Sequence, residues 1–204
     1  MKKLIIGCFV LFFSTVVFAQ EKIETPVWNI GDKWIYTAHP AMIVIKEDDS
    51  SYTVKSLTKT GEYFYIYDKS SLNILYSIEK DKRIPYKGVD KRILNFPLST
   101  GKTWKDTYST TVYRGNIRFP QEYSYIQSYA VLGWEDVEVK AGKFKSLKIG
   151  VKYERLQEIT GSPKEGKAWV WYSPDVKNLI KWQFEVGFWA GYDEWELTSF
   201  KLKK

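Results

Sequence analysis

Cysteine and histidine are almost missing from this sequence, and their scarcity excludes several kinds of chemistry. The chain of 204 residues contains one cysteine and one histidine. Cys8 lies within an apolar N-terminal run, so a mature chain without that run has no thiol for a disulfide, a metal site or nucleophilic catalysis. His39 precedes Pro40 and has no second histidine with which to form a zinc site or a catalytic triad. We therefore expect no metal, no cofactor and no enzymatic activity.

Long apolar runs are also scarce, and the one from Leu4 to Phe18 has the features of an export signal. Two lysines precede it, and Ala19 closes a small-residue cleavage site. The run has about 15 residues, whereas a membrane helix requires roughly 20, so we do not expect an integral membrane protein. We predict a signal peptide at 1–19, a flexible start at 20–25 and a single domain at 26–204.

Such a signal directs the protein to the periplasm or the exterior of a bacterial cell. Cys8 offers an alternative, a lipoprotein anchor, because the segment Ile5-Ile6-Gly7-Cys8 resembles a lipobox. A lipobox normally ends the apolar region, but here most of the apolar run follows the cysteine. We therefore expect cleavage after Ala19 and no lipid at Cys8.

Positive charge is in excess, but no stretch concentrates it. Lysine and arginine total 31 while aspartate and glutamate total 24, and the basic residues occur mostly singly along the chain. Nucleic-acid-binding proteins usually gather positive charge into a patch or an arm. The dispersed pattern indicates solvated sheet faces with a weak attraction to an anionic envelope surface, and no nucleic-acid partner.

Helical periodicity is missing, and a period of two takes its place. Apolar residues occupy the odd positions from Leu147 to Tyr153 and the even positions from Ile180 to Val186, with mostly polar residues between them. This alternation predicts antiparallel strands with one buried and one solvated face. We expect an all-β fold of about ten to thirteen strands, a strongly curved antiparallel sheet or half-open barrel, with a β-sandwich as the alternative. The candidate strands are 33–38, 42–47, 51–58, 62–68, 72–79, 91–96, 104–113, 122–131, 134–140, 144–158, 167–173, 179–187 and 193–202.

Two short segments share one spacing. The segments 30–34 (IGDKW) and 100–104 (TGKTW) both place a glycine three residues before a tryptophan. In each, a turn glycine precedes a tryptophan at the start of a strand, where we expect the ring to enter the core. One shared spacing does not by itself establish duplicated halves.

Four blocks occur in order across most of the mature chain. They are 31–36 (GDKWIY), 96–104 (FPLSTGKTW), 137–144 (VEVKAGKF) and 171–182 (WYSPDVKNLIKW). Together they resemble a broad group of bacterial secreted domains of unknown function, with the pattern G-[DN]-x-W-x-Y, F-P-L-x-x-G-x-x-W, V-x-V-P-A-G-x-F and W-Y-[SA]-P-x-V-G-x-V-K. This sequence departs from the pattern at Lys140, where the group usually has proline, and at Lys177-Asn178, where it usually has glycine.

The resemblance implies a curved antiparallel sheet, similar to the half-barrels of lipoprotein-carrier proteins. Both departures from the pattern lie at turns, so they concern local turn geometry rather than the fold. The group has no agreed activity, and a fold alone does not give a function. The resemblance therefore assigns no catalytic residue to this chain.

The acidic clusters give no catalytic or metal-binding pattern. Neighbouring residues in a strand point to opposite faces, and no cluster has calcium-loop spacing with an internal glycine. Ser173 lacks the flanking glycines of a nucleophile elbow. We expect the carboxylates to lie on the solvated surface. The clusters are Asp48-Asp49, Glu135-Asp136-Glu138 and Asp193-Glu194-Glu196.

Aromatic residues are abundant, at 17% of the chain, and most should fill the core. Two groups are candidates for contact with a ligand or partner because they place aromatic bulk where polar residues are usual. The alternatives are a turn folded onto the sheet edge for the first group and a strand covered on both faces for the second. The first group is Phe188, Trp189 and Tyr192, and the second is Tyr63, Tyr65 and Tyr67.

These observations lead us to expect a non-enzymatic secreted or periplasmic protein. It would bind a lipid or another apolar or amphipathic ligand, or an envelope protein, in the concavity of its sheet. The alternatives are a carbohydrate-contacting module and a purely structural or interaction protein with a filled core. A deep apolar groove favours lipid, whereas a shallow aromatic strip flanked by Asp, Glu, Asn or Arg favours a glycan. The sequence leaves the ligand and the oligomeric state open.

Overall fold

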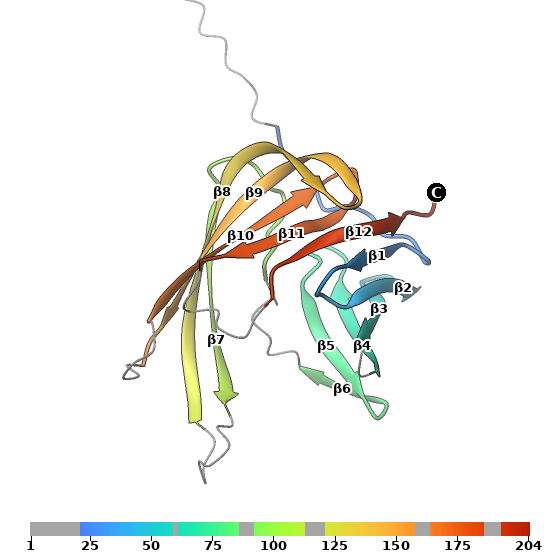
Figure 1. Ribbon diagram of the computed structural model, residues 1–204. Coiled ribbons are helices and arrows are strands. Elements are labelled where there is room, and N and C mark those ends of the chain that lie inside the picture. The colour runs from blue at the N-terminus through green and yellow to red at the C-terminus, as the bar shows by residue number, and fades with distance from the viewer. Residues whose placement is uncertain (1–20, 59–60, 86–91, 113–120, 158–163, 186–192) are drawn as a thin grey trace, which may run out of the picture.

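The computed structural model describes residues 21–204, apart from 59–60, 86–91, 113–120, 158–163 and 186–192 (Figure 1). The predicted signal peptide therefore lies outside the described residues. The described residues contain strands and turns but no helix, and thus no helix with the length and hydropathy to cross a membrane. The all-β prediction is confirmed.

The strands form a single 12-stranded antiparallel sheet in the order β6-β5-β4-β3-β2-β1-β12-β11-β10-β9-β8-β7. The first half comprises β1 (Lys33–Tyr36), β2 (Ala41–Glu47), β3 (Ser51–Thr58), β4 (Gly61–Asp68), β5 (Ile74–Glu79) and β6 (Lys82–Pro85). The second comprises β7 (Thr103–Val112), β8 (Gln121–Val139), β9 (Gly142–Arg155), β10 (Glu165–Ser173), β11 (Asn178–Phe184) and β12 (Trp195–Lys201).

Each half is a meander in which every strand pairs with its neighbour along the chain. The first and last strands, β1 and β12, pair with each other and join the two meanders at the centre of the sheet. The two edges, β6 and β7, do not pair, so the sheet is strongly curved but not closed into a barrel (Figure 1). This is the open, curved architecture that the sequence predicted.

The turn before β1 has a defined hydrogen-bond pattern. Gly31 adopts a φ of 93°, which favours glycine, and its N–H donates to the Val44 carbonyl at 2.8 Å. The Val44 N–H donates back to the Asp32 carbonyl at 2.9 Å, and the Asp32 N–H donates to the Asn29 carbonyl at 3.0 Å. The turn thereby fixes β1 against β2 and sets Trp34 opposite Met42.

The turn before β7 repeats this pattern atom for atom. Gly101 has a φ of 83° and donates to the Val131 carbonyl at 2.8 Å, while Val131 donates back to Lys102 at 2.9 Å. The Lys102 N–H also donates to the Ser99 carbonyl at 3.0 Å. The shared glycine spacing therefore corresponds to a shared local structure at the start of both meanders. Trp104, unlike its fully buried counterpart in β1, is only half-buried.

Two hydrophobic clusters form the core. The first surrounds Trp28 and Trp34, which are 2% and 0% exposed, and includes inward-facing residues of β1 to β3. The second lies on β8, β9 and β10. Residues 92–98, between β6 and β7, pack into the second cluster. The cores are therefore filled by the strands together with the segments 21–32 and 92–98, and this packing uses the side of the sheet on which we expected a ligand.

The predicted strand at 91–96 is wrong. Residues 92–98 follow an irregular path with one isolated bridge, Leu98 to Ile23. The Lys102 ammonium accounts for this path, because it donates to the carbonyl oxygens of Asn95 and, at 2.8 Å, Pro97. The apolar residues of this stretch, among them Ile93, Leu94 and Leu98, are buried in the second core cluster although the stretch is not a strand.

Two other boundaries differ from the prediction. The predicted strands 122–131 and 134–140 form one strand, β8, because a bulge between Val131 and Gly133 bends the strand without ending it. The edge strand β6 was not predicted, since it is short and its sequence, KRIP, has little alternation. The remaining predicted strands agree with the structure to within a few residues.

Candidate functional site

The first and fourth sequence blocks meet at the turn between β10 and β11. The Trp34 indole N–H donates to the Val176 carbonyl at 2.8 Å, and the Trp28 indole N–H donates to the Lys177 carbonyl at 2.9 Å. Lys177 adopts a φ of 59°, the left-handed region, at the turn where this chain departs from the four-block pattern. These hydrogen bonds attach the β10–β11 turn to the core of the first meander, so the two blocks have a structural role.

The other two blocks also make structural contacts. The Phe96 ring lies 5.4 Å from the Tyr172 ring in an edge-on arrangement, which links the second block to the fourth. In the third block, the Ala141 N–H donates to the Leu197 carbonyl at 3.0 Å, so the tip of the β8–β9 hairpin is attached to β12. Phe144 of the same block packs against Phe200. None of these contacts forms a catalytic arrangement.

The residues that could support catalysis or metal binding have structural partners. His39 packs its ring against Tyr36 and Trp195. Asp48 accepts hydrogen bonds from the N–H groups of Ser50 and Ser51, which hold the pKa of its carboxyl well below its usual range, at about 2. Within the described ranges no three His, Cys, Asp or Glu residues gather as a metal site would require.

The predicted tyrosine contacts on β4 have mixed surroundings. Tyr63, Tyr65 and Tyr67 share one face of the strand, and Tyr67 packs edge-on against Trp28 with ring centroids 5.4 Å apart. Tyr63 is 44% exposed, and Ile66, on the opposite face, is 3% exposed. The strand is therefore covered on both faces at its core end and open at Tyr63. The other predicted contacts, Phe188, Trp189 and Tyr192, lie outside the described residues.

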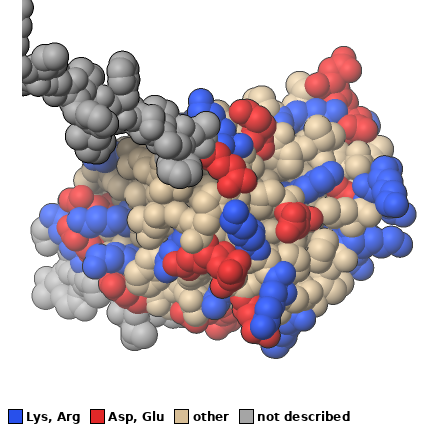
Figure 2. Space-filling view, turned by 90° about the horizontal axis from the view of Figure 1, so that it is seen from above, with Lys and Arg blue, Asp and Glu red and all other residues tan. Residues whose placement is uncertain are grey.

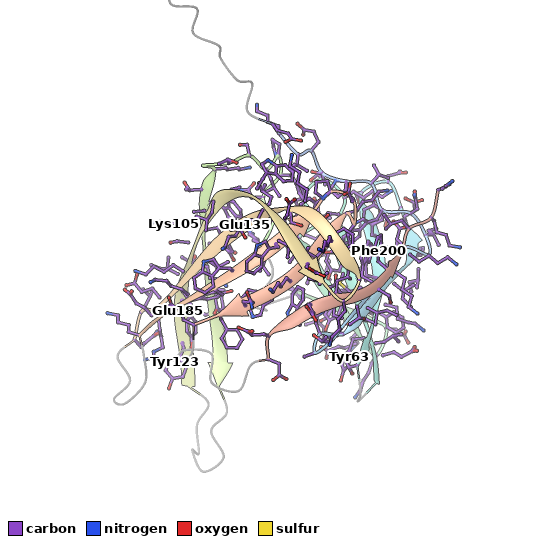
Figure 3. All side chains as sticks on the ribbon, turned by 45° about the horizontal axis from the view of Figure 1, so that its top comes forward. Tyr63, Lys105, Tyr123, Glu135, Glu185 and Phe200 are labelled. Atoms are coloured by element: carbon purple, nitrogen blue, oxygen red, sulfur yellow. The ribbon has the colours of Figure 1, made fainter. Side chains whose placement is uncertain are left out.

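A groove of about 510 Å³ lies on β7 to β10. Lys105, which lines it, lies in the half of the molecule away from Tyr63 (Figure 3). Its floor is one row of cross-strand partners, Trp169, Gly150, Ala130 and Thr103. The residues one position along each strand face the opposite side and belong to the second core cluster or pack against it. We call the groove side the open face and this depression the open-face groove.

Leu132 stands over the floor of the groove and remains 52% exposed. It lies two residues after Ala130, so the regular alternation of β8 places both side chains on the open face, just before the bulge at Gly133. A Cβ atom added at Gly150 would lie 3.3 Å from the Leu132 Cδ1 atom, so the glycine leaves the space that the leucine uses. The alternation of β8 and the glycine on β9 thus present a large apolar side chain beside the apolar floor.

Three lysines form the row beside this floor. Lys167 and Lys152 lie directly opposite each other on β10 and β9, and Lys105 completes the row across Ser128. Like charges on directly opposed residues are unfavourable in a sheet, so this row is not explained by sheet stability.

The salt bridges of this row leave positive charge available. Lys152 pairs with Glu165 at 2.9 Å and Lys167 with Glu185 at 3.6 Å, but all four side chains are about half exposed, so solvent weakens both pairs. Lys105 has no acidic partner among the described residues. Figure 3 shows Lys105 and Glu185 on this half of the molecule.

The surface charge on one face of the molecule is mixed. Figure 2 shows Lys and Arg side chains interspersed with Asp and Glu over the face in view, with uncharged surface between them. This agrees with the dispersed charge predicted from the sequence.

Next to the groove, Trp171 forms a polar cluster with Glu135 and two lysines. Its indole N–H donates to Glu135 Oε2 at 2.8 Å, and the Nζ atoms of Lys148 and Lys181 lie 5.1 and 5.4 Å from its ring centroid. Lys148 also pairs with Glu135 at 3.0 Å. The Trp171 hydrogen bond, opposed by partial burial and aided by Lys148, lowers the pKa of the Glu135 carboxyl.

This lowered pKa predicts a pH dependence of stability. The stabilising contribution of ionised Glu135 is fully present above the ordinary glutamate pKa near 4.5 and is lost as the pH falls through the lowered value. Glu135→Gln should therefore reduce the loss of unfolding free energy between pH 5 and pH 3, by less than about 1 kcal/mol because the side chain is 44% exposed. Urea denaturation at a series of pH values measures this, with Trp171→Phe as the variant that removes the indole donor. Parallel pH curves for wild type and Glu135→Gln would contradict it.

Comparison with known proteins gives two similar solved structures. A predicted lipoprotein from Parabacteroides distasonis matches 89% of this chain and 100% of its own, with 13% identity and a TM-score of 0.41. A predicted exported protein with a YmcC-like fold from Bacteroides fragilis matches 88% of this chain and 99% of its own, with 11% identity and a TM-score of 0.39. No family model and no curated protein sequence matches the chain. The four-block pattern therefore remains a hypothesis about its family.

Proposed function

We propose that the chain is a non-catalytic binding protein of the bacterial envelope, and that its open-face groove binds an anionic amphiphile such as a long-chain fatty acid. One observation carries this proposal: an apolar floor, with Leu132 raised over Gly150 and flanked by Trp169, lies directly beside a row of three lysines. The apolar part of the ligand would lie on the floor, and its acidic group would lie over the lysines.

The size and composition of the groove support this class of ligand. A volume of about 510 Å³ falls within the range of small-molecule sites. Among the residues that the structure describes, no acidic or amide side chain, which would favour a sugar, lines the groove. Its lining consists of glycine and of aliphatic, aromatic, hydroxyl and lysine residues. The lysine row gives an anion electrostatic preference over an uncharged molecule of the same length. The tyrosines of β4 and the 188–192 link remain further candidate contacts to be tested separately.

Leu132→Ser tests the apolar part of the proposed site. Removing a half-exposed leucine side chain that the ligand would cover should weaken fatty-acid binding about tenfold. Titration of a long-chain fatty acid, followed by tryptophan fluorescence and by native mass spectrometry, measures the dissociation constant. Leu156→Ser is the matched control, because Leu156 is 49% exposed but does not line the groove. Equal losses in the two variants, or no binding by wild type, would overturn the proposal.

The charge preference has its own comparison. The fatty alcohol of the same chain length has no carboxylate, so it should bind more weakly than the acid. Lys105→Gln should weaken binding of the acid and leave binding of the alcohol unchanged. If Lys105→Gln affects both ligands equally, the lysine row does not select an anion.

A further inference from the structure

The two edges of the sheet are protected to very different degrees. An edge strand offers unpaired backbone groups to other chains, and proteins usually blunt it with charge, proline, bulges or short length. The edge strand β6 has four residues, all exposed, and includes Lys82, Arg83 and Pro85. The edge strand β7 has ten residues and no proline, and from Thr107 to Val112 it carries no charge.

The pairing of β7 with β8 is also regular along its whole length. The register runs from Thr103 opposite Ala130 to Val112 opposite Gln121 without a shift, whereas β8 with β9, β10 with β11 and β1 with β12 all contain bulges. A long strand without a bulge keeps its outward backbone groups in line, which is the geometry that another strand requires.

The odd-numbered residues of β7 direct their backbone groups away from the sheet. The Leu156 N–H donates to the Ser124 carbonyl, which shows that Ser124 directs its backbone groups toward β9. In this part of β8 the even-numbered residues therefore direct their N–H and C=O groups toward β9, and the odd-numbered residues direct theirs toward β7. Tyr125 is opposite Tyr108, so the even-numbered residues of β7 form the backbone hydrogen bonds with β8. Among the described strands none lies on the other side of β7, so Ser109 and Thr111 have outward backbone groups.

We propose that the uncharged stretch 107–112 of β7 pairs antiparallel with the same stretch of a second copy. A two-fold axis near Thr110 would set Ser109 opposite Thr111 of the second copy and form about four backbone hydrogen bonds. Lys105 and Asp106 would then lie outside the paired stretch, so no like charges would face each other. The blunted β6 cannot continue the sheet, so pairing of β7 with β7 closes after two copies and does not lead to fibres.

This dimer has a consequence for the groove. Residues opposite each other in a sheet direct their side chains to the same face. The open faces of the two copies would therefore lie on one side of a continuous sheet, with Thr103 and Lys105 of each copy near the new junction. The pairing itself does not depend on what the groove binds.

Ser109→Pro tests the pairing. It removes an outward N–H that does not belong to the ladder with β8, and proline is tolerated on edge strands. We expect a concentration-dependent dimer of wild type in sedimentation equilibrium, and a dimer dissociation constant at least about tenfold weaker for Ser109→Pro. Ser109→Ala is the matched control, because it loses the same contact with the Ser124 hydroxyl but keeps the N–H, and it should dimerise like wild type.

Hydrogen exchange of the wild type gives a second measurement that needs no variant. The amides of Ser109 and Thr111 should exchange rapidly at low protein concentration and become protected at high concentration. The amides of Tyr108 and Thr110 should be protected at both, since they bond to β8. A chain that remains monomeric at about 1 mM, with exchange at Ser109 independent of concentration, would overturn the proposal.

Discussion

Replacing Trp34 with alanine should lower the free energy of unfolding by about 3–5 kcal/mol. The side chain is 0% exposed, and its ring centroid lies 5.1 Å from that of Trp28. Alanine would leave a cavity in the first core cluster and would deprive the buried Val176 carbonyl of the indole donor at 2.8 Å. Urea denaturation measures the loss, and a decrease in melting temperature on the order of 10 °C should accompany it.

Trp104→Ala is the matched control for this prediction. Trp104 occupies the same place at the start of the second meander, with the same turn before it, but is half-buried and stacks on Tyr129 at 5.0 Å. Its replacement should cost only about 1–2 kcal/mol. Trp34→Phe should fall between the two alanine variants, because it keeps most of the packing and loses the hydrogen bond. Equal losses for Trp34→Ala and Trp104→Ala would show that burial at Trp34 is not the cause.

Asp32→Ala should lower the free energy of unfolding by about 2–4 kcal/mol. The residue is 0% exposed, and its carboxylate accepts hydrogen bonds from the N–H groups of Asn29 at 2.9 Å and Lys203 at 2.6 Å. Alanine would leave both donors without this acceptor. Lys203 lies two residues after the end of β12, and hydrogen exchange should also show that its amide loses protection.

Two variants separate this effect from a general loss of an aspartate. Asp32→Asn keeps an acceptor oxygen but places an amide against one of the donors, so its cost should be smaller than that of alanine. Asp48→Ala also removes an acceptor of two backbone N–H groups, but in an exposed turn where water can replace it. If Asp48→Ala destabilises the protein as much as Asp32→Ala, burial of the carboxylate does not determine the cost.

Strand positions could be predicted from the sequence wherever the pattern depends on local alternation. From Leu147 to Tyr153, every second residue is buried, as the period of two required. The stretch at 91–96 misled the prediction because its apolar residues fit a strand equally well. Only the tertiary structure shows that the Lys102 ammonium donates hydrogen bonds to the Asn95 and Pro97 carbonyl groups. Propensity could not reveal a contact with a lysine later in the sequence.

The candidate site was harder to predict than the fold. Leu132 lies in an apolar run with Ala130 and Val131, so the sequence does not show that the period of two places it beside Ala130 on the open face. The lysine row is also hidden in the sequence, because Lys105, Lys152 and Lys167 come from three strands and become neighbours only through register. Glycine inside an alternating strand, as at Gly150, was the available signal, since it often marks a bulge or a close approach.

The pairing of β1 with β12 also determines the order in which the fold can be completed. Thr37 and Glu196, which are hydrogen-bonded across this junction, are 159 residues apart in the sequence. Closing so large a loop is slow, and it is possible only after nearly the whole chain has been synthesised. Until then β1 is an unpaired edge of the first meander, and the Trp34 indole N–H does not yet have the Val176 carbonyl as its acceptor. We therefore expect the centre of the finished sheet to form late in folding, and aggregation to compete with folding while β1 is still an unpaired edge.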